Sequence, residues 1–99
     1  MIKREDFIFT IGYSGSSAIV DSSLKKKFGS LDSEELAKKG LFKAALCSVI
    51  FANRESELDK VLAIYNSKTK EEAISSPEEL KRKFGVFEVP AEITRVIRI

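Results

Sequence analysis

Histidine is absent from this sequence of 99 residues, and Cys47 is its single cysteine. A chain without histidine cannot form a Ser–His or Cys–His catalytic pair, and it lacks the imidazole that many metal sites use. One cysteine also excludes an intramolecular disulfide. Two prolines and five glycines are too few for a collagen-like or low-complexity chain. These absences predict no metal and no cofactor, and they favour a protein that is not an enzyme.

Charge of one sign is not in excess, because 17 basic residues stand against 15 acidic ones and the net charge is +2. Dedicated nucleic-acid-binding proteins usually have a stronger basic bias, or one that is gathered on a single face. Hydrophobic residues make up 43% and charged residues 32% of the chain, which is the composition of a chain that folds around a core. We expect one compact domain over residues 1–99.

A long hydrophobic run is also missing. The longest apolar stretch, Leu41–Ala52, is too short to cross a bilayer and contains Lys43. Lys3 and Arg4 resemble the start of a signal peptide, but two acidic residues follow them directly. We therefore expect a cytoplasmic protein that does not bind a membrane, and the lone cysteine suits a reducing compartment. Abundant lysine and glutamate, without glutamine or tryptophan, resemble the composition of thermophile proteins.

The first part of the chain is predicted to contain a strand and a helix. Phe7–Tyr13 is aromatic and β-branched, with large apolar side chains at every second position, which predicts a strand. A turn rich in serine and glycine follows. Residues 18–28 fit two interpretations: one long helix that ends at a left-handed Gly29, which we favour, or a short strand and then a helix capped by Asp21.

Helices dominate the rest of the sequence. Further helices are predicted from the capping box of Asp32 and Glu35 to Gly40, over Leu41–Ala52, over Arg54–Asn66 with Asn53 as its cap, and from Ser76 and Pro77 to Phe84, with Gly85 at its end. Ile93–Ile99 is predicted as a strand, and the pattern leaves open whether Val86–Val89 forms another. Because a lone strand is not stable in water, we expect the first and last strands to pair. The predicted fold is α+β, a predominantly helical single domain with a small sheet formed by N-terminal and C-terminal strands.

The turn after the first predicted strand is a candidate anion-binding site. It consists of Ser14, Gly15, Ser16 and Ser17. Serine hydroxyls, a close backbone approach at glycine and the N–H groups of a following helix would suit a phosphate or a nucleotide. The turn lacks the lysine and the glycine spacing of known nucleotide-binding loops. Serine and glycine also form ordinary tight turns, so both interpretations stay open.

Two near-repeats place basic residues at the ends of predicted helices. The segments Leu24–Gly29 and Leu80–Gly85 differ only by one lysine in place of an arginine. Their basic residues are Lys25, Lys26, Lys27, Lys81, Arg82 and Lys83. Two such clusters on one face would contact nucleic-acid phosphates. Lysines also complement the negative end of a helix dipole, so a purely structural role explains the same pattern.

Neither the cysteine nor the carboxylates indicate catalytic chemistry. A reactive thiol needs exposure and a neighbouring positive charge, whereas Cys47 lies in the middle of an apolar segment. We expect it to be a packed core residue. Paired glutamates such as Glu78 and Glu79 fall in the first turns of predicted helices, where the helix dipole favours negative charge.

Three hypotheses about function follow from the sequence. The leading one is a small cytosolic, non-enzymatic binding or interaction module. Ile93–Ile99 has large apolar side chains on one face, where an exposed edge strand normally carries charge, and this favours a homodimer through the sheet or another protein partner. The alternatives are a nucleic-acid-binding protein that uses the two basic helix ends, and a phosphate- or nucleotide-binding protein that uses the Ser/Gly-rich turn.

Overall fold

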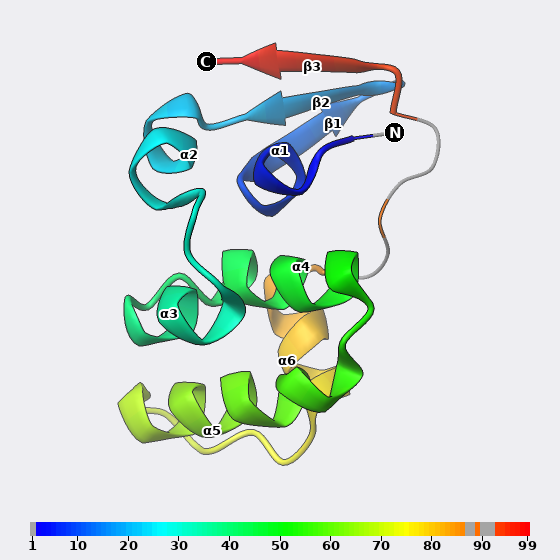
Figure 1. Ribbon diagram of the computed structural model, residues 1–99. Helices are drawn as coiled ribbons and strands as arrows, with labels where there is room; N and C mark the ends of the chain where they lie inside the picture. Colours follow the sequence, from blue (N-terminus) through cyan, green and yellow to red (C-terminus); the bar gives the residue numbers. More distant parts are fainter. Residues whose placement is uncertain (1, 87–88, 90–92) are drawn as a thin grey trace.

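The computed structural model describes residues 2–86, 89 and 93–99, and its fold is α+β, as the sequence predicts. In Figure 1 a three-stranded sheet lies above a layer of helices. The helices are α1 (Arg4–Ile8), α2 (Ser22–Phe28), α3 (Ser33–Lys38), α4 (Phe42–Ala52), the 3-10 helix η1 (Glu55–Glu57), α5 (Leu58–Lys68) and α6 (Pro77–Phe84). The strands are β1 (Thr10–Ser14), β2 (Ser17–Val20) and β3 (Arg95–Arg98).

The first helix, α1, lies where the sequence pattern predicts a strand. The prediction of a strand over Phe7–Tyr13 is wrong for its first half, because β1 starts only at Thr10. Phe7, Ile8 and Phe9 are all buried, and three consecutive buried side chains fit the end of a helix enclosed by other elements. A helix of five residues is not stable by itself, so tertiary contacts must hold it.

Arg4 supplies several of these tertiary contacts. Its guanidinium donates hydrogen bonds to the carbonyl oxygens of Gly29 and Leu31 and to the hydroxyl of Ser48. These bonds join α1 to the segment after α2 and to the central helix α4. They connect residues far apart in the sequence, so no local pattern predicts them.

β1 and β2 form an antiparallel hairpin, joined by Gly15 and Ser16. Gly15 has a φ of +59°, and among the described residues other than glycine only Asn53 has a positive φ. A positive φ at the first turn residue alone is the pattern of a type II′ turn, which glycine adopts without strain. The hairpin therefore accounts for the glycine in this turn.

The favoured prediction of one long helix over residues 18–28 is wrong, and the alternative is confirmed. Residues 17–20 form β2, where Ala18 and Val20 are fully buried and point to the same side. Asp21 then caps α2 by accepting a hydrogen bond from the Leu24 N–H at 3.1 Å. Apolar residues four positions apart predicted a helix here. Residues 17–20 instead satisfy their backbone hydrogen bonds by pairing with β1.

β3 pairs with β2 in parallel, and the order in the sheet is β1-β2-β3. The prediction that the first and last strands pair is therefore wrong, although both belong to one sheet. β1 lies on one side of β2, and β3 lies on its other side. Just before β3, the Thr94 N–H donates a hydrogen bond to the Ser16 carbonyl at 2.9 Å. The segment Val86–Val89, whose prediction as a strand was left open, includes residues 87 and 88, which lie outside the described residues.

The two faces of the sheet differ in burial. Ala18 and Val20 of β2 point to the core, and Val96 of β3 packs against it. Ile97 pairs with Ile19 on the opposite face, where Ile97 is 36% exposed. The sheet therefore has one covered face and one face that keeps large apolar side chains in solvent.

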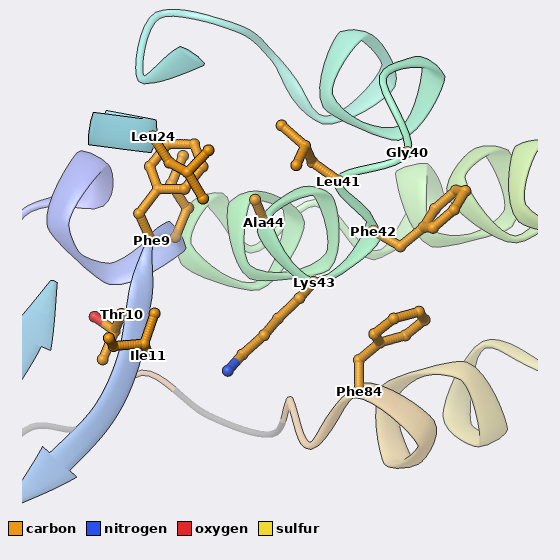
Figure 2. A pocket seen from close by; sticks show the side chains of 11 residues that line it. Phe9, Thr10, Ile11, Leu24, Gly40, Leu41, Phe42, Lys43, Ala44 and Phe84 are labelled. Carbon is orange, nitrogen blue, oxygen red and sulfur yellow. The ribbon is translucent and has the colours of Figure 1, made fainter. Parts of the chain in front are cut away.

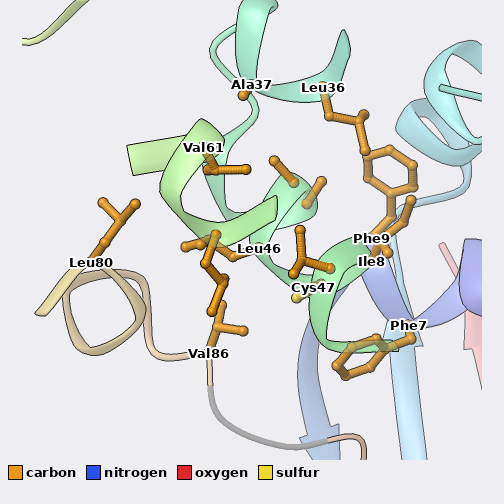
Figure 3. Packing of buried hydrophobic residues seen from close by; sticks show 14 of the residues in the cluster. Phe7, Ile8, Phe9, Leu36, Ala37, Leu46, Cys47, Val61, Leu80 and Val86 are labelled. Carbon is orange, nitrogen blue, oxygen red and sulfur yellow. The ribbon is translucent and has the colours of Figure 1, made fainter. Parts of the chain in front are cut away.

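Helix α4 is the centre of the helical layer, as its apolar sequence predicts. Residues 44–49 are all buried, and α4 contacts α1, α3, α5 and α6. Figure 3 shows Leu46 and Cys47 of α4 among buried side chains from the surrounding elements, including Val61 of α5 and Leu80 of α6. This cluster is the hydrophobic core.

The predicted caps of α3 and α6 are confirmed. The Asp32 carboxylate accepts a hydrogen bond from the Glu35 N–H at 2.8 Å, and the Glu35 side chain accepts one from the Asp32 N–H at 3.3 Å. Ser76 caps α6 by accepting from the Glu79 N–H, and α6 ends at Gly85 with a φ of +66°. Local chemistry was sufficient to place these helix ends.

Of two other predicted caps, that of Asn53 is wrong, whereas Gly29 caps α2 as predicted but in a different conformation. Asn53 does not cap the next helix; it ends α4 in the left-handed conformation, with a φ of 55°, and the 3-10 helix η1 then precedes α5. Gly29 has a φ of −63° and is not left-handed. Glycine suits this position for another reason, because a Cβ atom there would lie 2.5 Å from the Lys25 carbonyl oxygen.

Candidate functional site

The Ser/Gly-rich turn lies at the tip of the β1–β2 hairpin and not at the start of a helix. Ser14 and Ser17 pair across the hairpin, and the carbonyl and hydroxyl of Ser16 accept hydrogen bonds from Thr94. The interpretation of residues 14–17 as an anion-binding helix start is corrected on this point. Because a strand and not a helix follows the turn, no helix dipole attracts a phosphate there, and anion binding by residues 14–17 stays a prediction.

The two basic helix ends lie in different parts of the fold. α2, with Lys25, Lys26 and Lys27, lies beside the sheet, whereas α6, with Lys81, Arg82 and Lys83, packs against α4 and α5 (Figure 1). Lys25 donates a hydrogen bond to the buried Asp6 carboxylate at 2.7 Å. Lys83 pairs with Glu71 at 3.2 Å. Two of the six basic residues thus have carboxylate partners, and nucleic-acid binding stays a prediction.

Cys47 is buried, as the sequence predicts. Burial raises the pKa of the Cys47 thiol to about 11, and the nearby Lys43 ammonium lowers it by less. The thiol is therefore neutral at physiological pH and is not a nucleophile. Tyr13 lies beside it, at a pocket of about 270 Å³ that both residues line. Burial also raises the Tyr13 pKa.

Because the buried Cys47 thiol resists ionisation, we expect the free energy of unfolding to fall in alkaline solution. Above about pH 9 the thiol of the unfolded chain loses its proton, while the native thiol keeps its proton up to about pH 11. The native state then holds the extra proton, so its stability falls across this window. Urea unfolding should show the stability advantage of the native sequence over Cys47→Ala shrinking by about 1 kcal/mol between pH 8 and pH 10.

The control is the same comparison between pH 6 and pH 8. The thiol stays largely protonated there in both the native and the unfolded chain, so the stability difference should not change. Because Cys47 also raises the pKa of Tyr13, both proteins carry Tyr13→Phe in this comparison, so that the difference reports the thiol alone. A stability difference that is the same at pH 8 and pH 10 would contradict the burial of the thiol.

An apolar pocket lies between β1, the amino end of α4, and α6. Its volume is about 240 Å³, and it is lined by Ile8, Phe9, Thr10, Ile11, Leu24, Gly40, Leu41, Phe42, Lys43, Ala44 and Phe84. In Figure 2 the aromatic rings of Phe42 and Phe84 form one side, and Ile11 lies on the other. Ile11 is 55% exposed, so this pocket is an open groove with a large apolar side chain at its rim.

Lys43 is the charged residue of this pocket. Figure 2 shows its side chain leaving α4 and reaching into the space between Ile11 and Phe84. None of the lining residues is acidic, and within the described part of the chain no carboxylate forms an ion pair with Lys43. The pocket thus combines apolar walls with one ammonium group that pairs with no carboxylate of the described residues.

No pattern in the sequence predicted this pocket. Its lining comes from segments spread over residues 8–84, and no local spacing brings these segments together. One signal was present in the sequence: Lys43 is the single charged residue within the apolar segment Leu41–Ala52. A lone lysine in an otherwise apolar helix indicates a place where that helix reaches the surface.

The free edge of the sheet is the second feature of interest. β3 is the last strand in the order β1-β2-β3, and no described element pairs with its outer side. On the solvent face of the sheet, Ile19, Ile97 and Ile99 lie next to one another, and Ile99 is 66% exposed. We refer to these three residues as the isoleucine patch. Exposed apolar side chains beside an unpaired strand edge favour association with another chain.

Within residues 2–86, 89 and 93–99, no three or more cysteine or carboxylate groups come together as metal ligands. No helix in that part of the chain is both long and apolar enough to cross a membrane. The sites that stand out are the apolar pocket and the edge of β3.

Comparisons with known proteins add no likeness to this geometry. No protein family, curated protein or solved structure matches the chain.

Proposed function

We propose that this protein is a non-enzymatic interaction module that forms a homodimer by pairing the edge strand β3 of one copy with β3 of another. The observation that carries the proposal is the outer side of β3, which no described residue pairs with, beside the isoleucine patch. An open strand edge offers backbone donors and acceptors to a second strand, and adjacent apolar side chains gain from cover.

The hydrogen bonds of β3 indicate which backbone groups face outwards. The Ile99 N–H donates to the Val20 carbonyl at 3.1 Å, and the Ile99 carbonyl accepts from the Ser22 N–H at 3.2 Å. Alternate residues of a strand point their backbone groups to the same side. Ile97 and Ile99 therefore bond towards β2, and Val96 and Arg98 present their N–H and C=O groups to the open side.

This alternation favours one antiparallel register between two copies of β3. With a two-fold axis at Ile97, Val96 of one copy faces Arg98 of the other, so outward backbone groups meet each other. The two Ile97 side chains then lie together on the solvent face, and Arg95 of each copy faces Ile99. A register centred on Arg98 would instead place two arginines opposite one another, which is unfavourable.

The side chains support the same arrangement. Ile97 is 36% and Ile99 is 66% exposed, and a neighbouring strand would cover part of each. Arg98 already points to the covered face, where its guanidinium lies 3.5 Å from the Asp6 carboxylate. Its charge is thus partly compensated and does not oppose pairing. A homodimer also satisfies the isologous symmetry of most two-chain assemblies.

The mass of the protein in solution tests this proposal. Light scattering at concentrations from about 1 μM to several hundred μM should show a rise towards twice the 11.1 kDa of one chain. Pairing of two four-residue strands makes a small interface, and small interfaces associate in about the micromolar range. Ile97→Lys should weaken the dimer by at least about tenfold, since it places two ammonium groups next to each other.

Ile11→Lys is the matched control, because it adds the same charge at an exposed isoleucine of β1, on the opposite edge of the sheet. It should leave the mass unchanged. A native protein that stays monomeric at several hundred μM would rule out the homodimer. So would an Ile97→Lys variant that dimerises as well as the native chain.

A further inference from the structure

We infer that the apolar pocket around Lys43 binds a small carboxylate with an apolar body, such as an arylalkanoate. The inference goes beyond the proposed homodimer and does not depend on it. The pocket lies on the side of β1, whereas the proposed dimer uses β3, and the two strands are opposite edges of the sheet. Both sites are therefore accessible at the same time.

The size of the pocket limits the ligand. Sites for drug-sized molecules have volumes of about 300 Å³ or more, and the volume here is about 240 Å³. An apolar cavity of about 150 Å³ holds a benzene molecule. The pocket therefore has room for one aromatic ring and a short chain, and a larger ligand would extend into solvent.

The walls determine that the body of the ligand is apolar. Phe42 and Phe84 have their ring centroids 6.1 Å apart, with an interplanar angle of 40°, and both line the pocket. A ligand ring placed between them and Ile11 would contact aromatic and aliphatic carbon on several sides. It would also cover Ile11, which is now 55% exposed.

The charge of the site determines that the polar group of the ligand is an anion. Lys43 extends from α4 between the apolar walls (Figure 2), and among the residues that the structure describes none that lines the pocket is acidic. A carboxylate would neutralise this ammonium through a charge-assisted hydrogen bond, which is about twice as strong as a neutral one. A cationic ligand of the same shape would be repelled.

The experiment uses three probes of the same shape and different charge: 3-phenylpropionate, 3-phenylpropanol and 3-phenylpropylamine. Each is titrated into the full-length protein, and amide chemical shifts are followed by NMR. We expect 3-phenylpropionate to bind with a dissociation constant of about 1 mM or lower, and to shift the amides of Ile11 and of residues 40–44. The alcohol should bind about tenfold more weakly, and the amine more weakly still.

Variants separate the charge from the walls. Lys43→Met keeps an unbranched apolar chain and removes the ammonium, so it should weaken 3-phenylpropionate about tenfold and leave 3-phenylpropanol unchanged. Ile11→Ser removes part of the wall and should weaken both probes. Lys60→Met, on the exposed side of α5, is the control and should change neither.

Three results would overturn the inference. The first is a carboxylate that binds no more tightly than the alcohol, and the second is a Lys43→Met variant with unchanged affinity for 3-phenylpropionate. The third is the absence of shifts at residues 40–44 at saturating probe. A protein that fails to dimerise but passes these tests would disprove the proposed homodimer and leave the pocket assignment standing.

Discussion

Replacing Leu46 by alanine should lower the free energy of unfolding by about 3 kcal/mol, the largest effect that we expect from one substitution. Leu46 is completely buried, at the centre of the core, on the helix that contacts α1, α3, α5 and α6. The cost combines the lost burial of the side chain with the cavity that remains, because neighbours on several elements cannot all move inward. Domains of this size are stable by about 5–15 kcal/mol, so the loss is substantial.

Urea unfolding, monitored by circular dichroism, measures this loss. Leu62→Ala is the matched control, because it removes the same atoms from α5 at a position that is only partly buried. The control should cost about 1 kcal/mol, since less apolar area is involved. Equal losses from the two substitutions would contradict the central place of Leu46 in the core.

Removing the Asp6 carboxylate should have the second-largest effect, a loss of about 2–3 kcal/mol for Asp6→Ala. Its side chain is 3% exposed and lies 2.7 Å from the Lys25 ammonium and 3.5 Å from the Arg98 guanidinium. Loss of one partner of a buried ion pair costs about 3–5 kcal/mol when the other charge stays buried. Here Lys25 is 27% and Arg98 is 53% exposed, so both can regain water and the cost is lower.

The Asp6 network joins three elements that are distant in the sequence. Asp6 belongs to α1, Lys25 to α2 and Arg98 to β3. Beyond the loss of stability, Asp6→Ala should therefore increase hydrogen exchange in β3, because the contact between this edge strand and α1 is lost.

Glu5→Ala is the control for Asp6→Ala. Glu5 is the next residue on the same helix, and it forms a more exposed ion pair with Arg4 at 3.5 Å. Its loss should cost less than about 1 kcal/mol, because exposed pairs contribute little. If Asp6→Ala were no more destabilising than Glu5→Ala, the carboxylate would have no special role in holding α1.

Helices with local end signals could be predicted from the sequence. The capping box of Asp32 and Glu35 and the serine–proline start of α6 place hydrogen-bonding side chains within three residues of the groups they cap. The apolar stripe of α5 also predicted which side is buried, since Leu58, Val61 and Tyr65 are all in the core. In each case the interactions that decide the structure lie within one or two turns.

Elements that depend on distant partners could not be predicted in the same way. α1 has the composition of a strand, and its contacts come from Arg4 and Asp6 to residues 19 to 92 positions away. The near-repeats show the same limit. Their sequences are almost identical, yet Gly85 is left-handed and Gly29 is not. The residues that follow the two glycines differ, and so do the elements they lead to.

The features that bear on function also separate into those set by local interactions and those set by distant ones. The helix end signals and the apolar patterns along the chain already determined a helix-rich α+β domain, and the apolar segment Leu41–Ala52 determined a buried cysteine. Only the tertiary structure decided that the Ser/Gly-rich turn is a hairpin tip, that Lys25 forms an ion pair with Asp6, and that Lys43 lines an apolar pocket. The reason is physical: caps and stripes act within a helix turn, whereas a pocket or a strand edge exists only once distant segments have packed together.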